Sequence, residues 1–338
     1  PYDVPQNAVV YFGALQTNSM TEVILILIAG LVLFLYAVSN LSETIQKVLG
    51  DKAKKWILKF TSNTFYAVIT GTVITALLDS SSAVIIITIV FVNSGFLTFR
   101  QAMGIVLGAN IGTTVSSQII AMDIGKYSPI LLLIGFVMLI MSKSGKINNT
   151  GKVLLYFGVL FFGLFTMEKA VEPLRSTSTF TNVLQYTETP LRGTIIGAIA
   201  TLIIQSSSAT VGMAIILAKK GMLTISGAIA IMLGAELGTC SDTLLATIRG
   251  SRQAVKTGVL HLVFNLSSII AGLFFFRPFF AMVMFVSSRS SAQRTVANAH
   301  MLFNIGGVLF FVFALPIFEK LLNRLLPDKA PEVESTLT

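Results

Sequence analysis

A triplet of serines occurs twice in the sequence, each time behind a polar residue and inside an apolar stretch. The two segments run Asp79-Ser80-Ser81-Ser82 and Gln205-Ser206-Ser207-Ser208. A serine hydroxyl donates a hydrogen bond to an oxygen of an anion or offers a lone pair to a small cation, and it carries no charge. The residue types of both segments are therefore suited to holding a small ion and releasing it again.

The similarity between the two segments continues well beyond the serines. At a constant offset of 126 residues, about forty positions align without a gap, as expected of an internal repeat. Matching pairs include Gly71 and Gly197, Thr75 and Thr201, Gly95 and Gly221, Gly108 and Gly234, and Gly112 and Gly238. An internal duplication whose most polar part lies in apolar surroundings predicts a site formed between two pseudo-symmetric halves.

The composition excludes an ordinary soluble domain. Hydrophobic residues make up 54% of the chain and charged residues 12%, against about 25% charged in soluble proteins. Several apolar stretches approach or exceed the roughly 20 helical residues that cross a bilayer: Thr21–Leu41, Ala102–Met122, Ser128–Met141, Val153–Thr166, Ile225–Ala246, Thr257–Phe276 and Val296–Phe318. We therefore expect an all-α polytopic protein of the cell membrane, in contact with the lipid bilayer.

Charge and cysteine content exclude further classes. The net charge of +9 fits a membrane protein whose basic residues collect in cytoplasmic loops. No run alternates basic and aromatic residues, so we expect no nucleic-acid partner. The one cysteine, Cys240, excludes an intrachain disulfide and a cysteine metal cluster.

The distribution of lysines predicts the topology. The segment Leu49–Lys59 is rich in lysine and is expected to be a cytoplasmic loop, whereas Ser176–Thr189 has Glu188 as its one charge and is expected outside. Equivalent segments thus face opposite sides, which predicts two inverted-topology repeats. The arms on either side of each serine tip, of about 15 and 10 residues, reach only about 22 and 15 Å as helices, which predicts re-entrant hairpins. Lys219 and Lys220 lie on the wrong side in this scheme.

The expected organisation has five parts. These are residues 1–20, a tag or linker remnant or else a genuine N-terminal extension; 21–149, the first inverted repeat with its hairpin at about 63–93; 150–276, the second repeat with its hairpin at about 189–219; 277–325, C-terminal helices; and 326–338, a polar tail. The C-terminus is expected to be cytoplasmic. A homodimer is left open as the assembly.

A shorter pattern, His-x-x-Phe-Asn, occurs at His261 and again at His300. Residues spaced i, i+3 and i+4 share one face of a helix. Two interpretations remain open: the residues form a gate or wall of the site, or they pack helices together through hydrogen bonds of His and Asn. The packing interpretation is favoured.

The serines are expected to lie where a helix is interrupted at the depth of the membrane. Broken backbone is tolerated there only where it lines a cavity or is buried in protein. The N–H groups at a helix start attract an anion, and carbonyls freed at a helix end coordinate a small cation. We expect both tips to serve such a site.

These motifs resemble the type II sodium-dependent phosphate cotransporters. The resemblance rests on the paired Q-S-S-S segments, on Gly95-Phe96-Leu97-Thr98 and on Gly108-Ala109-Asn110-Ile111-Gly112-Thr113-Thr114, and it spans roughly Ile24 to Leu321. It implies sodium-coupled import of inorganic phosphate, with both tips meeting at a central site. The phosphate-binding residues would be Ser80, Ser81, Ser82, Gln205, Ser206, Ser207 and Ser208. We expect a bacterial-type member without the soluble C-terminal regulatory domain.

Two departures from the family pattern place carboxylates where amides are expected. Asp79 replaces a glutamine, and Glu236 aligns with Asn110. Asp242, which aligns with Ser116, adds a third acid nearby. An ionisable residue inside a membrane is a functional hypothesis because its burial is costly. Asp79 and Glu236 could bind sodium, Asp79 could accept the proton of a bound phosphate, or the acids could be structural.

The candidate sodium ligands combine these acids with polar residues of the repeated Gly-Ala-x-x-Gly-Thr motif. They are Asp79, Asn110, Thr113, Thr114, Glu236 and Thr239. Sodium is expected as the coupling ion, and no resident cofactor is expected.

Three other functions compete. A carrier of sulfate or dicarboxylates could use the same serine and helix-end physics. A membrane enzyme with a serine nucleophile needs an adjacent base, but both histidines lie far from the triplets in sequence and Gly-x-Ser-x-Gly is absent. We therefore expect no enzyme. Broken helices between inverted repeats also favour a carrier over a channel.

Overall fold

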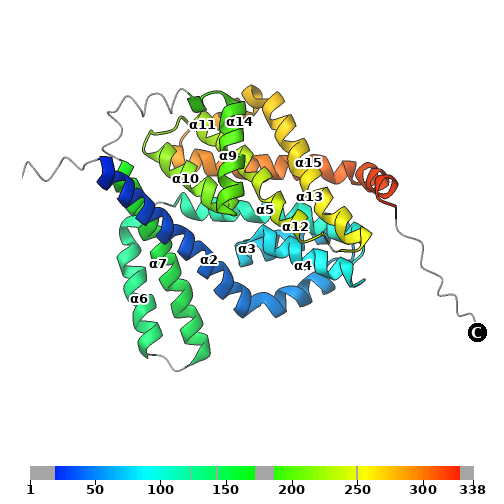
Figure 1. Ribbon diagram of the computed structural model, residues 1–338, viewed down its shortest axis with the longest axis horizontal. Coiled ribbons are helices and arrows are strands. Elements are labelled where there is room, and N and C mark those ends of the chain that lie inside the picture. Colours follow the sequence, from blue (N-terminus) through cyan, green and yellow to red (C-terminus); the bar gives the residue numbers. More distant parts are fainter. Residues whose placement is uncertain (1–19, 123, 142–143, 172–185, 249, 328–338) are drawn as a thin grey trace, which may run out of the picture.

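The computed structural model describes residues 20–122, 124–141, 144–171, 186–248 and 250–327, and no strand occurs within them. The α-helices are α2 (Met20–Lys59), α3 (Thr64–Leu78), α4 (Ser81–Asn93), α5 (Phe99–Ile120), α6 (Ser128–Met141), α7 (Gly145–Val171), α9 (Pro190–Ile204), α10 (Ser207–Lys219), α11 (Ile225–Gly238), α12 (Cys240–Leu245), α13 (Arg252–Phe274), α14 (Phe276–Val286) and α15 (Ala292–Leu325) (Figure 1). Six helical segments are long and apolar enough to cross a bilayer: α2, α5, α7, the α11–α12 pair, α13 and α15. The prediction of an all-α protein with several membrane-crossing segments is thus confirmed by its helices and its six candidate spans.

The duplication in sequence is matched by a duplication of helices. α3 and α4 have 15 and 13 residues, and so do α9 and α10, at the offset of 126 residues. α3 packs along α5 in the first copy, and α9 packs along α11 in the second. Each serine segment thus lies between two short helices, as predicted for the hairpins. That these hairpins are re-entrant and enter the membrane from opposite faces stays a prediction.

Glycines allow the close approach of these paired helices. A Cβ atom added at Gly108 of α5 would lie 1.9 Å from the carbonyl oxygen of Val68, and one at Gly234 of α11 would lie 1.8 Å from that of Thr194. Small residues at membrane helix interfaces bring backbones together, and packing is what stabilises such pairs. The repeated glycines therefore set how each hairpin sits on the helix that follows it.

We expect Gly234→Ala to destabilise the folded protein by about 2–3 kcal/mol or more, because backbone of α9 must move away from the added methyl group. The thermal unfolding midpoint of detergent-purified protein measures this effect. Gly50→Ala is the matched control, since a Cβ there meets nothing within 4 Å and alanine favours a helix over glycine by about 1 kcal/mol. Equal midpoints for Gly234→Ala and wild type would contradict the role given to Gly234.

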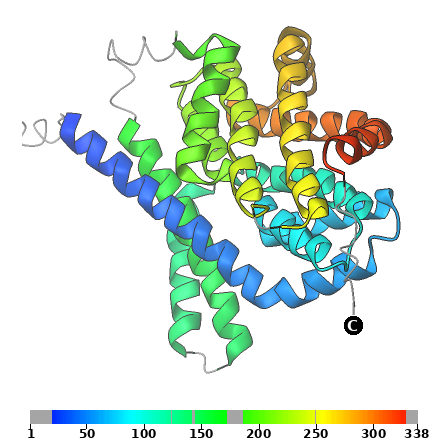
Figure 2. The same cartoon turned by 45° about the vertical axis from the view of Figure 1, so that its right-hand side comes forward.

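α2, α6 and α7 pack against one another beside the two serine hairpins. α2 packs against α7, and α7 packs against α6. Figure 2 shows α6 and α7 side by side, extending away from the other helices, with α2 running past them towards α3 and α4. α2 is thus the element that connects α6 and α7 to the first serine hairpin.

The prediction that the lysine-rich segment Leu49–Lys59 is a loop was wrong. The segment forms the last part of α2. Its four lysines, two leucines and one alanine are good helix formers, and no proline interrupts them. The excess of lysine indicates a side of the membrane and does not define the local backbone. The predicted loop at 176–189 lies largely outside the described residues, as does most of residues 1–20 and of the polar tail.

The predicted span Ile225–Ala246 is divided into α11 and α12. The hydroxyl of Thr239 donates to the carbonyl of Glu236 at 3.0 Å, and that of Ser241 donates to the carbonyl of Gly238 at 2.9 Å. Such local side-chain bonds compete with the regular helical pattern. The stretch is confirmed as long and apolar enough to cross a bilayer, and its helix is interrupted at Thr239.

Lys219 and Lys220, at the end of α10, both contact Glu168 of α7. The Nζ–carboxylate distances are 2.6 Å and 3.0 Å, and all three side chains are largely buried. Opposite charges brought together in this way lower the cost of removing each from water. The contact with Glu168 gives Lys219 and Lys220 a structural role, although the topology predicted from loop charges put them on the wrong side of the membrane.

Candidate functional site

The two serine tips have the same local geometry. The residues that end α3 and α9, Asp79 and Gln205, adopt the left-handed conformation with φ of 54° and 60°. The next residues, Ser80 and Ser206, cap α4 and α10, and each hydroxyl accepts from the N–H three residues on at 3.2 Å. Non-glycine residues in the left-handed region are uncommon and cluster at functional sites.

Both tips line one cavity of about 530 Å³. Asp79 and Ser80 come from the first tip, and Gln205 and Ser206 come from the second. Water in the liquid occupies about 30 Å³ per molecule, so the cavity has room for a small anion and several waters. Residues that are 126 positions apart in sequence thus face the same space.

The remaining serines of the triplets do not line this cavity. Ser81 and Ser207 are buried in the first turn of α4 and α10. Ser82 instead donates to Asp242 of α12 at 3.4 Å. Of the seven residues expected to bind the anion, the structure places three beside the cavity: Ser80, Gln205 and Ser206.

Asp79 is the acid that a tip contributes to the cavity. Its Oδ1 accepts a hydrogen bond from the hydroxyl of Ser116 in α5. In the second copy, the residues at the equivalent positions are Gln205 and Asp242. The first copy therefore carries its acid on the hairpin tip, and the second copy carries its acid on the helix after the hairpin. As a result, the first tip contributes a carboxylate to the cavity and the second tip contributes a neutral amide.

The polar residues of the Gly-Ala-x-x-Gly-Thr motif lie inside α5 and around the α11–α12 break, and none lines the cavity. Asn110, Thr113, Thr114 and Thr239 are buried, and each donates to a carbonyl of its own helix at 2.8–3.2 Å. A hydroxyl that donates in this way keeps lone pairs that a cation can use. Within the described residues, no three His, Cys, Asp or Glu side chains are grouped so as to hold a metal ion.

Glu236 is paired with a histidine of α15. Its Oε1 lies 2.6 Å from Nε2 of His300, and Nδ1 of His300 lies 2.6 Å from the hydroxyl of Ser117 in α5. All three side chains are buried. His300 therefore connects α5 of the first copy to α11 of the second, and Glu236 does not reach the cavity between the tips.

The other histidine repeats half of this arrangement. Nδ1 of His261 lies 2.9 Å from the hydroxyl of Thr243, and Thr243 is 126 residues after Ser117. Asn265 lies beside Nε2 of His261, with its amide nitrogen at 3.0 Å. The Thr243 contact joins α13 to α12, and the amide of Asn265 also donates to the carbonyl of Glu236 in α11 at 3.2 Å. Such buried hydrogen bonds between helices are what the packing interpretation of the His-x-x-Phe-Asn motif expects.

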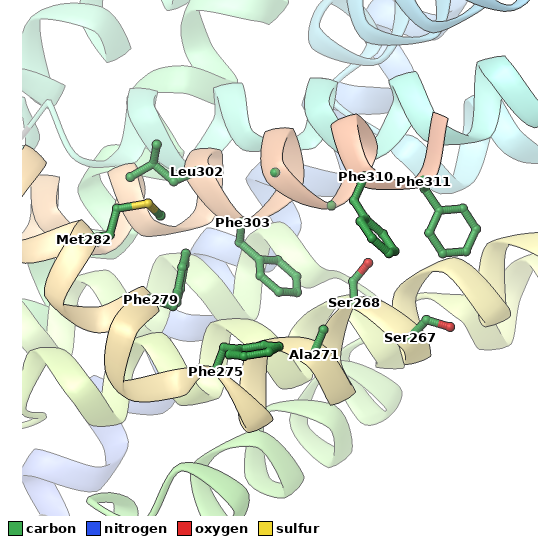
Figure 3. A pocket seen from close by; sticks show the side chains of 13 residues that line it. Ser267, Ser268, Ala271, Phe275, Phe279, Met282, Leu302, Phe303, Phe310 and Phe311 are labelled. Atoms are coloured by element: carbon green, nitrogen blue, oxygen red, sulfur yellow. The ribbon is translucent and has the colours of Figure 1, made fainter. Parts of the chain in front are cut away.

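A second cavity, of about 250 Å³, is nearly all apolar. Figure 3 shows the rings of Phe275, of Phe279 in α14 and of three phenylalanines in α15 around it, with the hydroxyls of Ser267 and Ser268 in α13 at one side. It contains no charged group, and its polar lining is limited to two serines, so it offers an anion few partners. The cavity between the serine tips is the better candidate site.

Sequence reasoning missed one wall of that site. Four polar side chains of α2 line the cavity beside the tips: Ser39, Ser42, Glu43 and Gln46. Their spacing of i, i+3, i+4 and i+7 places them on one face of α2. This spacing is the feature of the sequence from which that wall of the site could have been predicted.

Comparison with known proteins agrees with the internal duplication of the chain. The family model for Na+/Pi-cotransporters matches the chain twice, at residues 33–169 and 166–316. The "Uncharacterized protein YqeW" of Bacillus subtilis is 30% identical over 312 residues, covering 90% of this chain and 99% of that protein. No solved structure matches the chain significantly.

Two further relatives have names that state a substrate. The "Putative inorganic phosphate export protein YjbB" of Salmonella typhimurium is 25% identical over 92% of this chain, which spans 57% of that protein. The human "Sodium-dependent phosphate transport protein 2B" is 33% identical over 108 residues, 31% of this chain and 16% of that protein. The chain therefore belongs to the Na+/Pi-cotransporter family, a family of transporters and not of enzymes.

Proposed function

We propose that the protein is a sodium-coupled secondary transporter that carries inorganic phosphate across the cell membrane by alternating access. Phosphate binds in the cavity of about 530 Å³ between the two serine tips. The observation that carries this proposal is that Ser80 and Ser206, each at the start of a helix, line the same cavity. Two helix starts with hydroxyl caps form a neutral anion site.

Neutral donors suit a carrier because the anion must leave as readily as it enters. The tips contribute hydroxyls, an amide and the N–H groups of two helix starts, with no arginine or lysine among the residues that line the cavity. Sodium supplies the positive charge that the site lacks, and Asp79 is its most direct ligand at the cavity. Coupling then follows because sodium and phosphate stabilise each other in one site.

Import is the direction that a sodium gradient drives, and we propose it as the working direction. The relatives named as phosphate exporters favour efflux as the second candidate. A carrier with one site open alternately to either side runs in the direction that the combined gradients favour. The same cavity therefore serves either direction, and the gradients decide between them.

Uptake of radiolabelled phosphate into proteoliposomes tests the proposal. With sodium outside and potassium inside, we expect phosphate to accumulate, and with the gradient reversed we expect preloaded phosphate to leave. Arsenate should compete for uptake, whereas sulfate and succinate should not. Uptake that is unaffected by replacing sodium with potassium would refute the coupling, and competition by sulfate or succinate without arsenate would indicate another small anion.

A further inference from the structure

One face of α2 completes the cavity between the tips. Ser39, Ser42, Glu43 and Gln46 line it together with Asp79 and Gln205 of the tips. Polar residues in a membrane-spanning helix are costly and face a partner or a water-filled cavity. Here four of them gather on the cavity side of α2, whereas exposed residues earlier in the helix, such as Ile28 and Val32, are apolar.

A chain of hydrogen bonds joins this face to the first serine tip. Nε2 of Gln46 donates to the hydroxyl of Ser42 at 2.9 Å, and that hydroxyl donates to the carbonyl of Leu78 at 3.2 Å. Leu78 is the last residue of α3 and precedes Asp79. The carbonyls of a final helical turn lack partners within the helix, so α2 satisfies one of them at the tip itself.

The one charged side chain of this face, that of Glu43, is paired with a lysine of α2. Glu43 lies 2.6 Å from Lys47, one turn further along α2. An anion in the cavity therefore meets this wall mainly through neutral groups, of which Gln46 is the most versatile. Its amide N–H groups donate to phosphate oxygens, and its amide oxygen accepts the proton of a protonated phosphate.

Resting on the proposed function, we propose that Gln46 of α2 is a phosphate-binding and selectivity residue, held towards the tips by Ser42. The amide of Gln46 contacts the anion from α2 while Ser80 and Ser206 contact it from the two helix starts. Sulfate carries no proton at neutral pH and cannot donate to the amide oxygen. A site built to bond a hydroxyl rejects an analogue without one more strongly than an apolar pocket does.

Gln46→Met tests the inference with little change in side-chain length or helix propensity. Because a hydrogen bond to a charged group is lost, we expect the KM for phosphate to rise about tenfold or more. The half-saturating sodium concentration should stay within about twofold, and sulfate should become a better inhibitor of phosphate uptake relative to wild type. Gln46→Glu, which keeps the shape and adds a like charge, should raise the KM further.

Asn40→Met is the matched control. Asn40 lies on α2 between the cavity-lining residues, its amide donates to the carbonyl of Tyr36 at 2.8 Å, and it does not line the cavity. We expect its kinetics to match wild type. Wild-type kinetics for both Gln46 variants would overturn the inference while phosphate transport stands, whereas absence of phosphate transport by the wild-type protein would overturn the proposed function itself.

Discussion

Ser206→Asp should lower sodium-driven phosphate transport about a hundredfold or more while leaving the protein folded. Ser206 caps α10, and its hydroxyl accepts from the N–H of Ala209 at 3.2 Å. Aspartate is as good a cap as serine and interacts favourably with a helix start. In the cavity, however, its carboxylate takes the place of the anion and repels it. A like charge at about 4 Å costs a few kcal/mol near a protein surface, and about 2.7 kcal/mol is a hundredfold in affinity.

The matched control for this substitution is Ser251→Asp. Ser251 caps α13 in the same way, accepting from the N–H of Ala254 at 3.3 Å, but it lies outside the cavity. Transport by Ser251→Asp should equal that of wild type, and both variants should unfold at or above the wild-type temperature. If Ser206→Asp transports phosphate normally, the anion does not bind at the tip of the second copy.

The positions of the hairpin helices could be predicted because their signals are local. A polar residue followed by serines interrupts two apolar stretches, and serine is a strong helix cap. The expected hairpins at about 63–93 and 189–219 correspond to the helix pairs that end at Asn93 and Lys219. The length of α2 could not be predicted in this way, because lysines after Leu49 indicate a side of the membrane and continue a helix equally well.

The repeat is the feature of the sequence that predicts the candidate site. Duplication required the two tips to have equivalent roles, and the structure places both beside one cavity. The contribution of α2 depends on how a long helix packs across the tip of α3, which no local pattern specifies. The pairing of Glu236 with His300 likewise joins residues 64 positions apart. The structure was needed to show that Glu236 pairs with His300 and does not line the cavity.

Asp79→Asn should raise the half-saturating sodium concentration about tenfold or more, with a smaller effect on the KM for phosphate at saturating sodium. Asp79 lines the cavity, and Ser116 donates to its Oδ1. Asparagine tolerates the left-handed conformation that residue 79 adopts, so the tip should keep its shape. The substitution removes one negative charge next to the proposed cation, and each 1.4 kcal/mol of lost attraction is a factor of ten.

Sodium-activation curves at several pH values separate the interpretations of Asp79. A change confined to sodium activation identifies a cation ligand, whereas a change confined to the pH profile identifies an acceptor for the proton of phosphate. Asp51→Asn is the control, because Asp51 is an exposed acid near the end of α2 that pairs with Lys54 at 3.4 Å. If Asp79→Asn alters neither curve, Asp79 is a structural acid. The sodium that couples to phosphate must then be sought among the buried hydroxyls and amides of α5 and around the α11–α12 break, because Asp79 is the one acid that the two tips contribute.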